Sequence, residues 1–568
     1  MHLSKAGCGL VVATFLVTSA CTDDGGEADT DEMGSESSAD ETDDTSAETD
    51  SSSDDTDEGS ETDTDTSSDD TDEGSETDTG TDTDTDTGED TGTDTEGELC
   101  GNGVLDEGEA CDDGNADETD ACTTLCQAPT CDDGILSGDE SDLDCGGSCA
   151  GCLTGQACEA ASDCTSGACE ESLCTLAAHV ATGNNHTCAV LSGGAVRCWG
   201  HGFDGALGYG NTTTIGDDET PAEVGDVALG GLAIDVSAGG FHSCARLDDG
   251  GLRCWGSADY GQLGYGNTLA IGEGLTPDWA GDVPVGGPVI DITAGSTHTC
   301  ALLEGGSVRC WGRSLSGQLG YANTLSVGDD ETPEEIGDVD VGGVVTQIAA
   351  GTTHTCALLE GGGVRCWGSA SQGKLGYANS QSIGDDETPA EAGDVQLGGA
   401  AVQVVAGGNH TCALLEGGAV RCWGRGGFGA TGYGDGENIG DDETPASAGD
   451  VPIGGTAVQL TAGYQHTCAL MSGGAVRCWG NGGQGRLGYA NEAVIGDDET
   501  PDTMGDVDLG EGAVAVEVAA GTYHTCALLT DDNLLCWGWG SNGRLGYGNT
   551  ENIGDDETPA SAGPVSYQ

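Results

Sequence analysis

The chain has 568 residues with a formal net charge of -89, 103 glycines and few aromatic residues. This charge argues against a nucleic-acid partner, because phosphate binding needs clustered Lys and Arg, and only 13 such residues exist. The abundant glycine favours short strands and tight turns over helices. The 28 cysteines are too many for a reducing cytosol unless they bind metal, so they point to export and disulfide bonds.

Residues 1–20 have the features of a signal peptide. One lysine, an apolar run and the small residues Thr-Ser-Ala precede Cys21. The stretch LVTSAC resembles a bacterial lipoprotein box, which implies that Cys21 is lipidated and becomes the mature N-terminus. Plain secretory cleavage after Ala20 is the alternative. We therefore expect an exported lipoprotein of the outer membrane or cell surface of a bacterium, or a secreted protein.

Residues 21–99 form an acidic low-complexity segment. Positions 22–98 contain 34 Asp and Glu residues and no Lys or Arg. A segment of this composition cannot bury a hydrophobic core, and its like charges repel one another into an extended chain. We expect a disordered tether between the lipid anchor, which is the only expected membrane contact, and whatever follows.

Residues 100–175 form a small cysteine-rich module with 12 cysteines. So little apolar surface cannot offset chain entropy unaided, which predicts disulfide bonds in an exported chain. Cys149 and Cys152 have the C-x-x-C spacing of a zinc or redox site, but outside the cell we interpret them as structural. The stretches CGNG and DEGEACDDGN resemble the cysteine-rich repeats of myxobacterial surface proteins. The connectivity of these cysteines does not follow from the sequence.

Residues 176–568 contain a repeated block in which His-[Thr/Ser]-Cys is followed, ten residues after the cysteine, by Cys-Trp-Gly. The period is 56 residues and stretches to 58 only at the last step. A catalytic site is needed once per domain, so a set copied into every repeat is interpreted as the core of each repeat. The histidines are His186, His242, His298, His354, His410, His466 and His524.

Each repeat has the pattern of a small β-sheet. Short runs such as VVTQIAAG, HTCALL and GVRCWG alternate with Gly-rich turns, and the period accommodates about four strands and a loop. The first unit lacks the strand that precedes LAAHVATG, and the final residues TPASAGPVSYQ supply the missing piece. We therefore predict an all-β, seven-bladed β-propeller over 176–568, closed by its C-terminal strand.

The string H-[TS]-C-A-L-L-x-G-G-x-V-R-C-W-G followed by GQLGYGN resembles the repeats of the regulator of chromosome condensation family. Members of that family form seven-bladed propellers, so the resemblance implies the same fold. The paired cysteines and the IGDDETP insertion resemble exported bacterial variants. Family precedent includes a secreted propeller that inhibits β-lactamases, which implies protein binding outside the cell.

The two cysteines of each repeat are placed to pair across a hairpin. Pairing Cys300 with Cys310 puts Leu303 opposite Ser307 and leaves a three-residue Glu-Gly-Gly loop, whereas a two-residue turn would place the cysteines on opposite faces. A metal site from His298 and the two cysteines is the alternative. The predicted disulfides join Cys188 and Cys198, Cys244 and Cys254, Cys300 and Cys310, Cys356 and Cys366, Cys412 and Cys422, Cys468 and Cys478, and Cys526 and Cys536.

Other repeated residues are interpreted as structural. Each histidine is expected to bond neighbouring backbone groups, and each Trp after the second cysteine to fill the core. An ion pair between Arg197, or its equivalents, and the Asp pair of IGDDETP is weighed, but the losses of the two features fall in different repeats. The Asp pairs are either calcium ligands or turn caps, at Asp217, Asp218, Asp329, Asp330, Asp385 and Asp386. No other cofactor is expected.

Function on such a ring is expected where the repeats differ. A second variable set follows Trp-Gly and mixes aromatic residues with Arg, as protein-binding hot spots do. The predicted function is a tethered, non-enzymatic and monomeric scaffold that binds an extracellular or surface protein or a glycan. The alternatives are guanine-nucleotide exchange, implied by the family, and a propeller-type hydrolase or lyase. The candidate binding face is the set of residues before each histidine: Asn185, Phe241, Thr297, Thr353, Asn409, Gln465 and Tyr523.

Overall fold

In the computed structural model the described residues are 169–170, 173–174 and 178–568. The signal, the acidic segment and Cys21 lie outside them, as does the cysteine-rich module except for the two-residue strands β1 (Cys169–Glu170) and β2 (Leu173–Cys174), which pair antiparallel. Within the described residues no helix is long and apolar enough to cross a membrane. The remaining elements all belong to the repeats.

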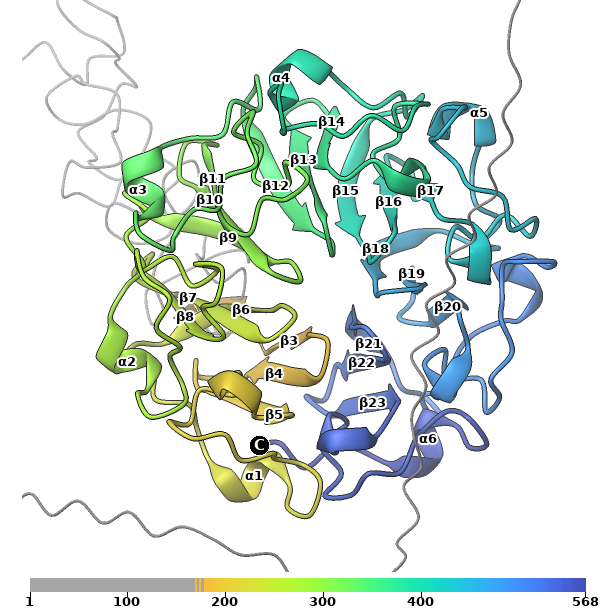
Figure 1. Ribbon diagram of the computed structural model, residues 1–568. Coiled ribbons are helices and arrows are strands. Elements are labelled where there is room, and N and C mark those ends of the chain that lie inside the picture. The colour runs from red at the N-terminus through yellow and green to blue at the C-terminus, as the bar shows by residue number, and fades with distance from the viewer. Residues whose placement is uncertain (1–168, 171–172, 175–177) are drawn as a thin grey trace, which may run out of the picture. The chain divides into compact units, whose positions relative to one another are not determined.

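Residues 178–568 form seven three-stranded antiparallel sheets arranged in a ring (Figure 1). This confirms the all-β, seven-bladed propeller. The inner strands are β3 (His179–Thr182), β6 (Ala233–Ala238), β9 (Val289–Ala294), β12 (Val345–Ala350), β15 (Ala401–Ala406), β18 (Ala457–Ala462) and β21 (Ala515–Ala520). Neighbouring inner strands contact one another, and β21 meets β3, which closes the ring.

Each middle strand begins at a repeat histidine and each outer strand ends at the glycine of Cys-Trp-Gly. The middle strands are β4 (His186–Val190), β7 (His242–Leu247), β10 (His298–Leu303), β13 (His354–Leu359), β16 (His410–Leu415), β19 (His466–Met471) and β22 (His524–Leu529). The outer strands are β5 (Val196–Gly200), β8 (Leu252–Gly256), β11 (Val308–Gly312), β14 (Val364–Gly368), β17 (Val420–Gly424), β20 (Val476–Gly480) and β23 (Leu534–Gly538).

The expectation of about four strands per blade is wrong. A fourth segment contributes only an isolated bridge in each blade, such as that between Gly200 and Ile215. The DDETP stretch that follows turns the chain into a short helix, because Thr caps it and proline fixes the backbone of its first residue. These helices are α1 (Pro221–Val224), α2 (Pro277–Ala280), α3 (Pro333–Ile336), α4 (Pro389–Ala392), α5 (Pro445–Ala448) and α6 (Pro559–Ala562), with 3₁₀ turn η6 (Pro501–Thr503) at the same place in the sixth blade.

Five further 3₁₀ turns follow the outer strands on one side of the ring. They are η2 (Phe203–Gly205), η3 (Ser371–Gly373), η4 (Gly427–Gly429), η5 (Gly483–Gly485) and η7 (Ser541–Gly543). The middle residue of each has a positive φ, for example 66° at Phe428. A positive φ is uncommon for residues other than glycine, so these loops after Trp-Gly are tight turns of the same shape in five blades.

The hairpin between middle and outer strands has the predicted register. Cys300 lies opposite Cys310, the Leu303 N–H donates to the Ser307 carbonyl, and Gly305 and Gly306 take positive φ values of 91° and 86°. All seven predicted cysteine pairs are disulfides in the structure, each between residues ten apart. These cysteines are therefore bonded to each other and do not form the alternative metal site with the repeat histidine.

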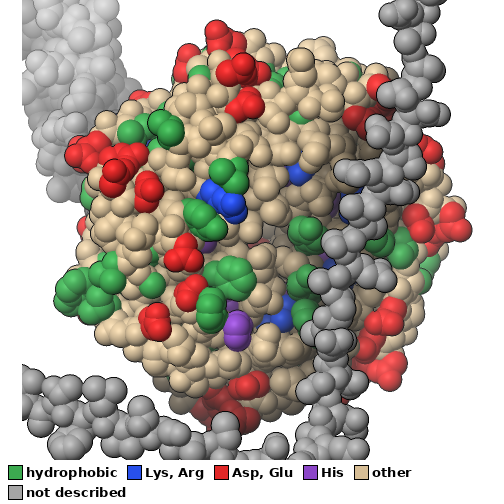
Figure 2. Space-filling model, viewed as in Figure 1, with side chains coloured by type: hydrophobic (Ala, Val, Ile, Leu, Met, Phe, Trp, Pro, Cys, Tyr) green, Lys and Arg blue, Asp and Glu red, His purple; other side chains and the backbone are tan. Residues whose placement is uncertain are grey.

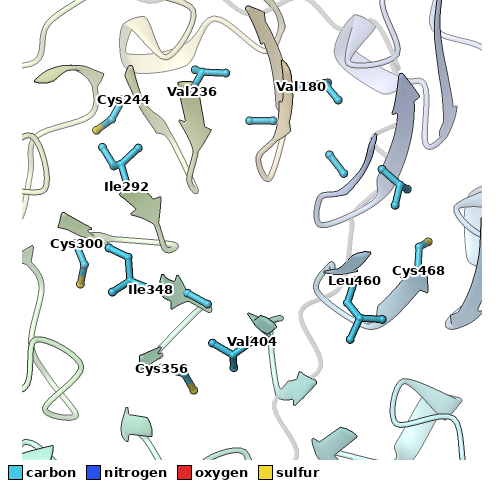
Figure 3. Close-up of a cluster of buried hydrophobic side chains, with 14 of the residues drawn as sticks. Val180, Val236, Cys244, Ile292, Cys300, Ile348, Cys356, Val404, Leu460 and Cys468 are labelled. Carbon is cyan, nitrogen blue, oxygen red and sulfur yellow. The ribbon is translucent and has the colours of Figure 1, made fainter. Parts of the chain in front are cut away.

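The core is a continuous belt that passes through all blades. The seven disulfides and the seven repeat tryptophans are fully buried, which confirms the core role predicted for Trp. Figure 3 shows Ile292, Ile348 and Val404 of successive inner strands following one another around the central channel, with Cys300 and Cys356 on their outer side. Each blade thus buries its apolar face against its neighbours, as repeats that cannot fold alone must do.

The C-terminal residues bridge the last blade and the first. Val565 donates its N–H to the Leu534 carbonyl of blade seven, and the Tyr567 carbonyl accepts from the Arg197 guanidinium of blade one at 3.0 Å. The expected closing strand is not formed, because these residues make no ladder pairs and lie as an extended segment. They make the contacts that the segment after each helix makes between the other neighbouring blades.

Candidate binding face

The repeat histidines form a closed circuit of hydrogen bonds from blade to blade. His242 Nε2 lies 2.9 Å from the Thr299 hydroxyl of the next blade, and His524 of the last blade lies 2.8 Å from Thr187 of the first. The sequence-based expectation that these histidines bond backbone groups is therefore wrong. Their partner is the Thr or Ser that follows the histidine of the next repeat, a residue which the repeat pattern already displayed.

The hydrogen-bond donors of this circuit show which nitrogen of each histidine carries the proton. The Thr299 hydroxyl donates to the Gln262 carbonyl at 2.8 Å, so its oxygen accepts the proton of His242 Nε2. Burial lowers the pKa of His242 to about 3 and that of His298 to about 4. The histidines are neutral, buried and tied to structural partners, which leaves them no catalytic part in this arrangement.

Tight backbone packing surrounds each histidine. Gly295 contacts the His298 ring, and a Cβ on Gly295 would overlap that ring and the Gly351 carbonyl. In the other six blades the residue after the corresponding glycine donates its N–H to the carbonyl of the equivalent glycine in the next blade, from Asn184 to Gly239 and finally from Thr522 to Gly183. These segments line the mouth of the central channel on the side where the 3₁₀ turns lie. We call this side the mouth face.

The outer rim holds the ion pairs. Arg309 Nε lies 2.9 Å from Asp338, and the same pair recurs in six blades, at Arg197, Arg253, Arg309, Arg365, Arg421 and Arg477. The partner is the Asp of the Gly-Asp-Val stretch, not the Asp pair of IGDDETP weighed from the sequence. The seventh blade has Leu535 and Pro564 at the two positions, so both partners are lost together. That joint loss was the signal that sequence reasoning missed.

The Asp pairs of IGDDETP lie on the turns before the short helices. Asp329, Asp330 and Glu331 place carboxylate oxygens within 4.8 Å of one another, and the same trio occurs at 217–219, 385–387, 441–443 and 497–499. Burial and the neighbouring Asp330 raise the pKa of Glu331 to about 7. Both the turn role and calcium binding at Asp217, Asp218, Asp329, Asp330, Asp385 and Asp386 stay predictions.

The residues before each histidine lie around the channel mouth on one face. The backbone N–H of the residue after Trp-Gly donates to the carbonyl of this residue, as from Arg313 to Thr297 and from Arg425 to Asn409. The two variable sets are therefore adjacent. The exposed members on this face include Phe203, Phe241, Tyr260 and Phe428, which are 37% to 53% exposed. Figure 2 shows hydrophobic, Lys and Arg side chains toward the middle of this face, and acidic side chains around its circumference and, in one sector, beside the hydrophobic side chains.

Aromatic rings and arginines are paired across this face. The Arg313 guanidinium lies 4.6 Å from the centre of the Tyr260 ring, and that of Arg425 lies 5.0 Å from the Phe428 ring. The Phe203 ring contacts Phe241 edge to face with centres 6.1 Å apart. The Arg313 and Phe203 contacts join neighbouring repeats and the Arg425 contact lies within one loop, so the face has preformed aromatic groups rather than isolated side chains.

Three members of the second variable set lie beneath this surface. Lys374, Arg486 and Arg544 are 2%, 3% and 0% exposed. Lys374 Nζ donates to the Asn409 side chain at 2.9 Å, and burial lowers its pKa to about 8. Arg544 lies 4.4 Å from the centre of the Trp539 ring and donates to the Asn184 carbonyl. The sequence identified these positions as variable but could not show that their cations are covered.

The central channel breaks the sevenfold pattern at its inner strands. His179 lies 2.6 Å from Glu517 of blade seven and 3.1 Å from Asp235 of blade two, and Arg246 joins the latter. The two carboxylates raise the pKa of His179 well above 6.5 despite its burial. In blades three to six the same position is Asp291 or a glutamine, whose side chain accepts the N–H of the next inner strand. These groups hold neighbouring blades together.

Comparison with known proteins agrees with this architecture. Residues 228–565 match the RCC1-like domain, and residues 177–206 match the regulator of chromosome condensation (RCC1) repeat. The chain is 31% identical to the ultraviolet-B receptor UVR8 of Arabidopsis thaliana over 375 residues, covering 65% of this chain and 78% of the receptor. It is 27% identical over 363 residues to the human E3 ubiquitin-protein ligase HERC2, covering 63% of this chain but only 7% of the ligase.

Solved structures show the same fold. Yeast RCC1 (Prp20) bound to Kap60 has a TM-score of 0.51 and 21% identity, covering 64% of this chain and 83% of that one. Prp20p from Saccharomyces cerevisiae, described with its binding to Gsp1p and histones, also has a TM-score of 0.51, with 20% identity over 64% of this chain and 85% of that one. With the matched domain covering more than half of its length, the chain belongs to the RCC1-like propeller family.

Proposed function

We propose that this protein is an exported, surface-tethered binding module that engages a protein or a glycan through the mouth face. The signal features and Cys21 support export and lipid anchoring, and the acidic segment supports a tether. The abundance of cysteine supports the same compartment, because disulfides persist in oxidising surroundings. Protein partners of the relatives, such as Kap60 for yeast RCC1, support binding as the general activity.

The observation that carries this proposal is the separation of shared from variable residues. The shared His, Cys and Trp are buried, and the shared Arg is ion-paired. The variable residues meet on one face, where Phe203, Phe241 and Phe428 are exposed. Large exposed aromatic side chains beside arginine are what protein-binding surfaces use as anchors. When different residues stabilise the fold and bind the partner, the binding residues can vary without destabilising the fold.

A photo-crosslinking experiment tests the proposal. Benzoylphenylalanine is placed in the full chain at Phe241 or Phe428 on the mouth face, or at Ile336, which is 43% exposed in α3. We expect a saturable adduct with one identified surface protein or glycan from the two face positions only. That partner is then purified, and its affinity is measured for the Phe241→Ser and Ile336→Ser variants. Equal adducts from all three positions, or none, would contradict the proposal.

The second candidate is nucleotide exchange on a small GTPase. The fold of the yeast RCC1 structures, one of which is described with its binding to Gsp1p, favours it. Export would separate this chain from such a partner. The assay is release of labelled GDP from purified GTPases of the source cell in the presence of the full chain. Accelerated release would favour exchange over surface binding, and unchanged release leaves the binding module as proposed.

A further inference from the structure

The cations of the propeller fall into two groups that differ in partner and place. All of the chain's 13 Lys and Arg residues except Lys5 lie in 178–568. Seven arginines have an Asp carboxylate within 4.0 Å, six at the rim and Arg246 at the channel. The remaining five have no such carboxylate among the described residues, and all five belong to the mouth face: Arg313, Lys374, Arg425, Arg486 and Arg544.

The absence of a carboxylate of the described residues within 4.0 Å of any of these five is unusual for so acidic a chain. The chain has 102 Asp and Glu residues, and the rim arginines each find one. Arg486 and Arg544 instead donate to backbone carbonyls and lie over the Tyr523 ring, at 5.1 and 5.7 Å from its centre. Carbonyls and aromatic faces solvate a guanidinium without cancelling its charge. The mouth face therefore carries cations that are not ion-paired with any described residue, on a strongly negative molecule.

Two of the five are reachable from solvent together with apolar side chains. Arg313 and Arg425 are partly exposed, and their aromatic partners Tyr260 and Phe428 are 37% and 41% exposed. Leu315, two residues from Arg313, is 63% exposed. A guanidinium held over a ring keeps donors free for a carboxylate, while the ring edge and the leucine offer apolar contact. The face thus combines anionic and apolar recognition at the same loops.

The chain's own acidic segment is a poor match for this combination. Residues 22–98 contain 34 carboxylates but no aromatic residue and no Leu, Ile or Val. Such a segment could neutralise the arginines but would leave Leu315 and the aromatic side chains in water. The occupant that fits both features is a segment in which Asp or Glu residues alternate with large apolar residues.

We propose that the mouth face binds an acidic segment of a partner protein that carries large apolar residues, with Arg313 and Arg425 receiving its carboxylates. The aromatic partners of these arginines and Leu315 contact its apolar side chains, and the three buried cations add a favourable potential beneath. This inference rests on the proposed binding function and names the chemistry of its partner. It also predicts that binding weakens with salt, because the surface cations are screened.

Fluorescence anisotropy with labelled peptides tests this assignment on the full chain. The first peptide alternates Glu with Leu and Phe, the second has Lys in place of Glu, and the third is the chain's own acidic residues 60–75. We expect binding of the first peptide only, weakened in about 0.5 M salt. The double variant Arg313→Gln/Arg425→Gln should bind about tenfold more weakly, since two charge-assisted contacts are lost.

The matched control is Arg365→Gln, which removes an arginine ion-paired at the rim. It should bind the first peptide as the unmodified chain does, and circular dichroism should show all variants folded. Equal binding of the Lys peptide, or no effect of the double variant, would overturn the assignment. Equal binding of the chain's own peptide would identify that segment as the occupant instead. A crosslinked partner whose affinity falls with Phe241→Ser but not with the double variant would refute only this inference and leave the binding function standing.

Discussion

The residues shared by the repeats, which are the buried His, Cys and Trp and the ion-paired rim Arg, are here called the network. The network and the mouth face use the same residue types in opposite ways. In the network, arginine is ion-paired, Trp is covered and every blade repeats its neighbour. On the mouth face, arginine lies over aromatic rings without a carboxylate, Trp539 is partly exposed and each blade differs. In a repeat protein, therefore, the type of a residue does not by itself show whether its role is structural or in binding. Whether the residue recurs at its position in each blade says more.

The largest expected contrast is the response of the network to acid. The buried histidines have lowered pKa values, about 4 for His298 and His410. They contribute stability that is complete above their unfolded pKa of about 6.5 and is lost as the pH falls toward 4. His298 and His410 should each cost about 2 kcal/mol between pH 7 and pH 5, and the other five histidines act in the same direction. Asp291, whose pKa burial raises to about 7, opposes this trend.

Denaturant titrations at pH 7 and pH 5 measure this contrast. His298→Gln keeps an N–H donor for the Thr355 hydroxyl but removes one titrating group. It should reduce the loss of unfolding free energy between the two pH values by the share of one histidine. A loss that is the same in the variant and the unmodified chain would show that His298 is not neutral in the fold.

The next contrast compares a buried tryptophan with an exposed phenylalanine. Trp311 is fully buried and donates to the Gln262 carbonyl, whereas Phe428 is 41% exposed. Trp311→Ala should lower the unfolding free energy by about 3 to 5 kcal/mol through a cavity in the core. Phe428→Ala should change it by less than about 1 kcal/mol and act on binding instead. Comparable losses in both variants, measured by chemical denaturation, would contradict the separation of the two regions.

A smaller effect is expected from one of the seven disulfides. Replacing Cys300 and Cys310 together by Ser opens a loop closed between residues ten apart. The loop-entropy account gives a loss of about 2 to 3 kcal/mol in unfolding free energy. Peptide binding at the mouth face should be unchanged, because the two cysteines lie in the core. A change in affinity without a change in stability would show coupling between the network and the face.

The smallest expected effect distinguishes the two kinds of arginine. Arg365→Gln should lower the unfolding free energy by at most about 1 kcal/mol, since Asp394 is half exposed and solvent screens the pair. Arg313→Gln should leave the unfolding free energy nearly unchanged and weaken the acidic peptide. For both variants, the melting temperature reports stability and the fluorescence anisotropy reports binding of the acidic peptide. If Arg313→Gln destabilises more than Arg365→Gln, then Arg313 belongs to the network.

Much of the network could be predicted from the sequence, because its residues recur at the same positions in each repeat. The hairpin register and the disulfides followed from the ten-residue spacing of Cys300 and Cys310, since a three-residue loop puts both on the same face and a two-residue turn does not. The partners of the histidine and the rim arginine did not follow, because both contacts join segments whose distance depends on blade geometry. The Arg309 to Asp338 contact joins residues 29 apart in the chain. The His298 to Thr355 contact crosses to the next blade.

The mouth face was predicted in part. The positions before each histidine were expected on one face, because equivalent positions of a ring lie on one side, and their part in binding stays a prediction. Which of its cations reach solvent could not be predicted, since burial of Lys374 and Arg544 depends on neighbouring loops of different blades. The Arg313 to Tyr260 pair is likewise a contact between two repeats, which no single repeat displays.

The histidine circuit has a consequence for how such a protein changes over generations. The histidine of each blade donates a hydrogen bond to the hydroxyl of the next blade, and the hydroxyl of each blade accepts one from the blade before. Every blade therefore makes the same two connections. A blade exchanged for another copy of itself by recombination would keep both connections. Its two or three surface residues would nevertheless arrive in a new position and order. Among blades four to six, where Gln347, Gln403 and Gln459 make the same contact between inner strands, whole blades could therefore be exchanged with little change in the interior.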